Sequence, residues 1–229
     1  RWSSHTAGLN VPVAQWPVPT RLPSFQLNTR TDRAQTYYLK LQHRSPIAEH
    51  PELVSAVEYI AAASLSGGLM GLMLGLFGLL TLLRLQTAVL YRNSHFAWFA
   101  LFVVSLLSAQ LILMGFAGQR IWPHSSYLNQ VMFWITSLWA VAACLWFILQ
   151  VSYAKQTFAR IYQLSCGIIA LLLLCSAVFA VVNQQFPRGG LTLVTSLAIV
   201  WSMGCLVWMA WRAQPWLWVV TAGFAPLAL

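Results

Sequence analysis

The chain of 229 residues is 59% hydrophobic and only 7% charged, whereas a soluble domain carries about 25% charged residues. Its net charge of +9 does not indicate nucleic-acid binding, because all four acidic residues lie within the first 58 positions and the later basic residues separate long apolar runs. The composition therefore excludes an ordinary soluble domain and indicates a protein whose main partner is the lipid bilayer.

Residues 1–53 are polar and proline-rich, without helical periodicity. Alternation with period two over residues 24–28 and 37–44, on either side of a polar connection, predicts two strands of a hairpin. Two strands alone are only marginally stable in water, so we expect the end of a larger extracytoplasmic β domain. Residues 1–5 are not followed by the apolar region of a signal peptide, and the chain stops inside an apolar run. We therefore interpret it as a piece of a longer protein.

From residue 54 onward the sequence is a series of apolar runs, and roughly 20 such residues are enough for a helix to cross the hydrocarbon core. Apart from Glu58, at the start of the first run, none contains a charged residue. The sequence predicts an all-α polytopic membrane helix bundle over residues 54–229, with six visible spans of an expected seven. The predicted spans are residues 54–83, 96–117, 128–150, 162–182 and 191–211, and a sixth that begins near 216 and is cut short.

The basic residues between these runs predict the orientation of the bundle. The first, third and fifth connections hold five of them, and the second and fourth hold only Arg120 and Arg188. Because Lys and Arg are enriched in cytoplasmic connections, we expect the first set in the cytoplasm and the N-terminal segment outside. The first set comprises Arg84, Arg92, Lys155, Arg160 and Arg212.

The first predicted helix carries glycines at spacings of four, four and three residues, which places them on one face: Gly67, Gly71, Gly75 and Gly78. Such small-xxx-small faces allow helices to approach closely. Two interpretations stay open, packing within the bundle and a dimer or sliding interface that signals. In the second helix, Gln110 is the most polar side chain at mid-membrane depth. It either forms a hydrogen bond that joins two helices or contacts a ligand.

The second connection, which the charge count places outside, combines rigid, aromatic and charged residues: Gln119, Arg120, Trp122, Pro123 and His124. One interpretation is an interfacial anchor with a turn. The other is a contact with a ligand or with the β domain.

Catalytic and cofactor sites are not indicated by the residues within the spans. The cysteines lie in apolar runs without CxxC spacing, which argues against a metal site or a disulfide framework: Cys144, Cys166, Cys175 and Cys205. Both lysines lie outside the spans, which excludes a retinal Schiff base in the visible helices. His95 and His124 fall at opposite faces and cannot jointly ligate a haem. We therefore expect no cofactor and no catalytic activity in this chain.

The run YRNSHFAWFALF at residues 91–102 and the run GFAGQRIWP at 115–123 resemble the bacterial seven-transmembrane receptors with diverse intracellular signalling modules, the 7TMR-DISM family. That family enters its second helix with a basic residue and spaced aromatics, as in Arg92, Phe96 and Phe99. After that helix it has the pattern G-x-x-x-Q-x-x-W-P, matched by Gly115, Gln119, Trp122 and Pro123. Residues 23–41 look like the closing strands of its extracellular jelly-roll domain.

This resemblance implies a transmembrane signal-transducing module in the bacterial inner membrane. It would couple a periplasmic ligand-binding domain, with a carbohydrate as a candidate ligand, to a cytoplasmic output domain beyond Leu229. A homodimer is compatible with such a receptor. The alternative is a small-molecule transporter or channel, which would need helices interrupted at mid-span and polar groups along a path. A membrane enzyme would need a cluster of His, Asp or Glu at one membrane face, where the predicted cytoplasmic connections offer only Arg, Lys and His95.

Overall fold

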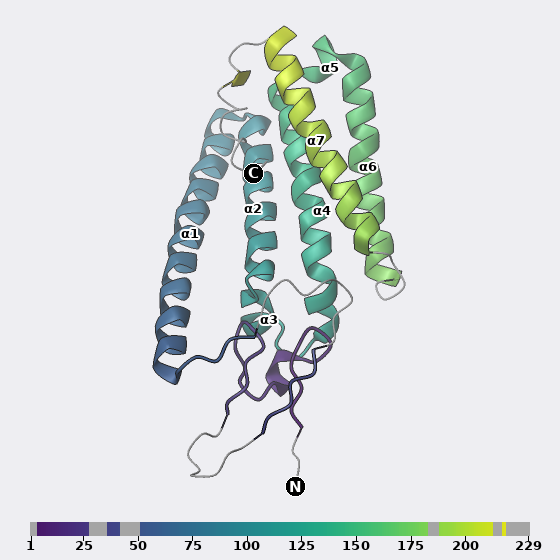
Figure 1. Ribbon diagram of the computed structural model, residues 1–229. Coiled ribbons are helices and arrows are strands. Elements are labelled where there is room, and N and C mark those ends of the chain that lie inside the picture. The colour runs from purple at the N-terminus through teal and green to yellow at the C-terminus, as the bar shows by residue number, and fades with distance from the viewer. Residues whose placement is uncertain (1–3, 28–35, 42–50, 183–187, 213–216, 219–229) are drawn as a thin grey trace.

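The computed structural model describes residues 4–27, 36–41, 51–182, 188–212 and 217–218, and it is mostly helical (Figure 1). Five helices are long and apolar enough to cross a membrane, which confirms the predicted all-α polytopic bundle. They are α1 (Ala56–Tyr91), α2 (Ser94–Leu113), α4 (Ser126–Val151), α6 (Ala159–Val182) and α7 (Arg188–Arg212). Three short helices complete the described structure: η1 (Val13–Gln15), α3 (Phe116–Arg120) and α5 (Ala154–Thr157).

Successive long helices run in opposite directions, and the N-terminal segment lies against one end of the bundle (Figure 1). We call this the junction end, where α1, α4 and α7 begin. The opposite end, where α1 and α4 finish and α2 and α6 begin, is the far end.

Helix α1 begins with a reciprocal capping arrangement. The Ser55 hydroxyl accepts a hydrogen bond from the backbone N–H of Glu58, and the Glu58 carboxylate accepts one from the backbone N–H of Ser55. The helix ends where Arg92 adopts a left-handed conformation, with φ of 49°. The predicted end at residue 83 was therefore wrong by eight residues, because residues 84–91 contain neither Gly nor Pro to stop the helix.

The predicted span over residues 96–117 is divided in two. Helix α2 ends at Leu113, and Gly115 adopts a φ of +75° before α3 begins at Phe116. Because glycine has no Cβ, it reaches this conformation without the steric cost that other residues meet. A chain corner therefore separates α2 from the loop that carries Gln119 and Trp122.

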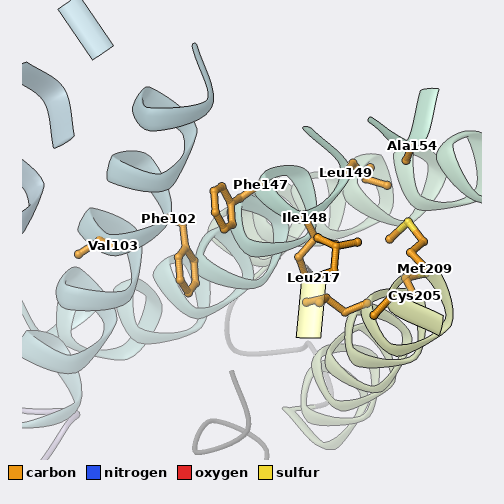
Figure 2. Close-up of a cluster of buried hydrophobic side chains, with 11 residues drawn as sticks. Phe102, Val103, Phe147, Ile148, Leu149, Ala154, Cys205, Met209 and Leu217 are labelled. Carbon is orange, nitrogen blue, oxygen red and sulfur yellow. The ribbon is translucent and has the colours of Figure 1, made fainter. Parts of the chain in front are cut away.

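Helix α4 lies at the centre of the bundle and contributes to both hydrophobic clusters. In Figure 2, Phe102 of α2, Ile148 of α4 and Met209 of α7 belong to one cluster of buried side chains. The second cluster joins α4, α6 and α7 and includes Leu138 and Phe179. Helix α1 packs mainly against α2 and is the least buried of the five candidate spans.

Tryptophan–serine hydrogen bonds join neighbouring helices inside the bundle. The indole N–H of Trp139 in α4 donates to the Ser176 hydroxyl in α6 over 3.1 Å. The indole N–H of Trp201 in α7 donates to the buried Ser165 hydroxyl in α6 over 3.0 Å. Such bonds satisfy polar groups that would otherwise face hydrocarbon, and they fix the register of α6 against both neighbours.

The predicted hairpin does not form over the described residues. An isolated antiparallel bridge joins Val18 to Ser24, and residues 36–41 are exposed and have no regular secondary structure. A strand needs a neighbouring strand for its backbone hydrogen bonds, and the described residues provide none beyond that bridge. Residues 28–35 and 42–44 of the predicted hairpin lie outside the described residues. The predicted sixth span does so as well, except for residues 217–218, where Leu217 is buried in the first cluster.

Candidate functional site

The N-terminal segment folds compactly before it meets the helices. Its 3-10 helix η1 places Val13 and Trp16 so that both are buried. The indole N–H of Trp16 donates to the Val11 carbonyl over 3.0 Å, which closes the turn around η1. The segment therefore presents a defined surface to the bundle.

The segment contacts the connection between α2 and α4, and the first turns of α4, through hydrogen bonds donated from both sides. The backbone N–H of Ala14 donates to the Pro123 carbonyl over 3.0 Å. In the other direction, the Gln119 side chain donates to the Pro19 carbonyl over 3.0 Å, and the Gln130 side chain donates to the Asn10 side-chain oxygen over 3.1 Å. We call this interface, together with the contacts of Arg21 and Ser24 described below, the junction.

The loop is itself held on α4. The indole N–H of Trp122 donates to the side-chain oxygen of Asn129 over 2.7 Å. Gly118 is buried against the same oxygen, and a Cβ at position 118 would lie only 2.5 Å from it. The Trp122 ring and the Asn129 amide thus fix the loop that carries Gln119 and Pro123.

Arg21 joins the N-terminal segment to α1. Its guanidinium donates to the Ala63 carbonyl over 3.1 Å and to the Ser66 hydroxyl, and it lies 3.7 Å from the Met70 sulfur. Ala63 and Met70 lie roughly two and four turns beyond the start of α1. The side chain therefore extends along the helix rather than capping its end.

The backbone of Arg21 contacts a second element. A Cβ at Gly115, on the corner between α2 and α3, would lie 2.5 Å from the Arg21 carbonyl oxygen. A further hydrogen bond, from the Ser24 hydroxyl to the Tyr59 hydroxyl over 3.2 Å, also connects the segment to α1. Arg21 thus contacts α1 through its side chain and the α2–α3 corner through its main chain.

The structure brings together three of the five loop residues that the sequence singled out: Gln119, Trp122 and Pro123. The side chains of Arg120 and His124 are exposed and make no hydrogen bond to a described residue. The sequence interpretation missed Arg21, Asn129 and Gln130. A signal existed for the last two, because they are adjacent amides at the start of an otherwise apolar run. Nothing local distinguishes Arg21 from the other arginines of the N-terminal segment.

The glycine face of α1 is not in contact with the described part of the bundle. A Cβ built on any of its four glycines meets no atom within 4 Å, and three of them, Gly67, Gly71 and Gly75, are exposed. The described residues therefore do not provide the packing partner that one interpretation expected, and the dimer interpretation stays a prediction. Gln110 is exposed and makes no side-chain hydrogen bond to a described residue. Among the described residues, no three His, Cys, Asp or Glu side chains are grouped as metal ligands.

Comparison with known proteins agrees with this architecture. A family model described as 7TM diverse intracellular signalling matches residues 67–229, which is more than half of the chain. No curated protein and no solved structure gives a significant match. The matched region includes α2, the Gly115 corner, the loop that carries Gln119 and Trp122, and the helices that follow. The chain is therefore a multi-pass membrane protein that belongs to the 7TM diverse intracellular signalling family of receptors.

Proposed function

We propose that this chain is the transmembrane signal-transducing module of a bacterial inner-membrane receptor. It couples a periplasmic ligand-binding domain to a cytoplasmic output domain, and it carries no catalytic activity of its own. The distribution of cations supports this orientation. Arg84, Arg92, Lys155, Arg160 and Arg212 all lie toward the far end, whereas the connections at the junction end hold Arg120 and Arg188. Since positive charge is enriched on the cytoplasmic side, the junction faces the periplasm.

The observation that carries the proposal is the double contact of Arg21. Its guanidinium is bonded to α1 and its carbonyl oxygen lies against the corner between α2 and α3. A displacement of the N-terminal segment therefore acts on two helical elements at once. A ligand that binds one arrangement of the segment better than another would shift the population of two bundle packings by that difference in affinity. The lack of neighbours along the glycine face, among the described residues, leaves α1 room to move.

Thiol labelling tests the orientation. Single cysteines are introduced at two exposed positions, by His5→Cys in the N-terminal segment and by Lys155→Cys in α5 at the far end. A membrane-impermeant maleimide is added to spheroplasts before and after permeabilisation. The parent chain is the control for the four native cysteines, which lie within α4, α6 and α7. We expect His5→Cys to react in intact spheroplasts and Lys155→Cys only after permeabilisation, and the reverse pattern would overturn the orientation.

A pair of arginine variants in the full-length receptor tests the coupling. Arg21→Gln removes a charged donor that bonds to α1, whereas Arg120→Gln removes an exposed arginine of the same end that has no such bond to a described residue. A hydrogen bond to a charged group contributes about 1.5–3 kcal/mol, so its loss can change the ratio of two bundle packings by about tenfold or more. We expect Arg21→Gln to shift the basal activity of the output domain in isolated membranes, with Arg120→Gln behaving like the parent. Parental activity in both variants would contradict the coupling role.

A further inference from the structure

A groove of about 330 Å³ opens on the lateral surface of the bundle between α2, α4 and α6. Three tryptophans dominate its walls, Trp98, Trp139 and Trp146, and Trp139 is half exposed. The only hydroxyl in the lining is that of Ser105, which donates to the Leu101 carbonyl of its own helix over 2.9 Å. The indole N–H of Trp146 is buried and has no hydrogen-bond partner among the described residues, and the surface that lines the groove is almost entirely apolar. The groove therefore suits a hydrocarbon chain rather than a polar solute.

The groove lies within one leaflet of the membrane. At the far end its lining begins about one turn into α2 with Trp98 and just over one turn from the end of α4 with Trp146. It stops near mid-helix at Ser105, Trp139 and Leu173. An acyl chain that occupies it therefore belongs to a lipid whose headgroup lies at the far end.

Each of the three helices that line the groove has a cation at that end. Arg92 precedes α2 by two positions, Lys155 lies in α5 directly after α4, and Arg160 is in the first turn of α6. All three side chains are exposed, and no acidic residue follows Glu58 in the sequence to pair with them. Helices α2 and α6 also begin here, so the positive ends of their dipoles point toward the same region. Helix α4 ends here and contributes the negative end of its own dipole. The formal side-chain charges at this end of the three helices are nevertheless all positive.

We propose that this groove binds an anionic phospholipid, with one acyl chain between Trp98, Trp139 and Trp146 and the headgroup phosphate against Arg92, Lys155 and Arg160. Charge complementarity selects this occupant over a zwitterionic lipid, because a basic residue near a membrane surface contributes about 1 kcal/mol of attraction to anionic headgroups. This contribution corresponds to a roughly fivefold preference for each cation. In the orientation proposed above, the lipid is one of the cytoplasmic leaflet.

Native mass spectrometry of the delipidated chain in a nonionic detergent tests the site. Dioleoyl phosphatidylglycerol and dioleoyl phosphatidylcholine are titrated in parallel. Ala143→Leu places a larger side chain into the groove, and its matched control is Ala170→Leu, at an exposed alanine of α6 outside the lining. A triple variant, Arg92→Gln with Lys155→Gln and Arg160→Gln, removes the charge without altering the groove. Its control is Arg212→Gln on α7, which contributes no lining residue.

The parent is expected to bind phosphatidylglycerol with one dominant site and phosphatidylcholine much more weakly. Ala143→Leu should abolish that site, and the triple variant should weaken it on the order of a hundredfold, the product of three fivefold losses. Both controls should bind like the parent. Equal affinity for the two lipids, or an equal loss in Arg212→Gln, would overturn the headgroup assignment. Undiminished binding in Ala143→Leu, or no binding by the parent because another segment of the chain fills the groove, would overturn the site itself.

Discussion

The Gly115→Ala variant provides the most direct test of the junction geometry. Gly115 has a φ of +75°, and an alanine in the left-handed region costs about 1–2 kcal/mol. The new Cβ would also lie 2.5 Å from the Arg21 carbonyl oxygen, which is backbone and cannot rotate away as a side chain would. Overpacking of this kind costs typically about 1–3 kcal/mol.

The reduced entropy of the unfolded chain offsets part of this loss, by about 0.4–1 kcal/mol for a Gly-to-Ala change. We therefore expect a net destabilisation of about 1–4.5 kcal/mol, together with displacement of the N-terminal segment from the corner. The matched control is Gly75→Ala. Gly75 is helical and a Cβ there meets no atom within 4 Å, so the control should be neutral or stabilised by up to about 1 kcal/mol.

Unfolding in mixed micelles of a mild detergent and dodecyl sulfate, followed by helical circular dichroism, measures both variants. A shortened chain that lacks residues 1–22 separates the two causes. In that background the clash with Arg21 is gone while the φ of Gly115 is unchanged, so the net cost of Gly115→Ala should fall by about two thirds. If Gly115→Ala is as stable as Gly75→Ala in the full chain, the close approach of Arg21 to the corner is refuted.

Two further predictions concern contacts between helices. The Arg84 guanidinium lies over the rings of Phe96 and Phe99 at 5.9 and 5.8 Å, so Arg84→Met should cost about 0.5–1 kcal/mol. A double-mutant cycle with Phe99→Leu checks this, and zero coupling energy would contradict it. Trp201→Phe removes the hydrogen bond to buried Ser165 and should cost about 1 kcal/mol. Adding Ser165→Ala should then cost less than it does in the parent, and strict additivity of the two losses would count against the bond.

The membrane helices could be predicted from the sequence because lipid as solvent requires long uncharged runs, and such runs are visible without any tertiary information. Helix ends were harder to place. Residues 84–91 continue α1 although Arg84 interrupts the apolar run, because its guanidinium forms cation–π contacts with the Phe96 and Phe99 rings of α2. That partner is known only once α1 and α2 are packed together.

The junction was predictable only on the side where its residues form a local pattern. Gln119, Trp122 and Pro123 lie within five positions of one another in a short connection, so the sequence alone indicates a candidate contact site there. Arg21 lies 42 positions before Ala63 and 94 before Gly115, and no periodicity connects such distant positions. The N-terminal hairpin was predicted from alternation alone. Alternation shows which side chains share a face, but it does not supply the neighbouring strand that a sheet requires.

Helix α1 extends for 36 residues, or about 54 Å, whereas the hydrocarbon core of a bilayer is about 30 Å thick. Within the bundle it packs mainly against α2, so one neighbouring helix and the junction contacts of Arg21 and Ser24 hold its tilt. A helix longer than the local bilayer accommodates the mismatch by tilting. The angle of α1, and with it the height of Ala63 and Ser66 relative to Arg21, therefore depends on bilayer thickness. If Arg21 couples the N-terminal segment to α1 as proposed, we expect the output of the receptor to change with bilayer thickness as well as with ligand.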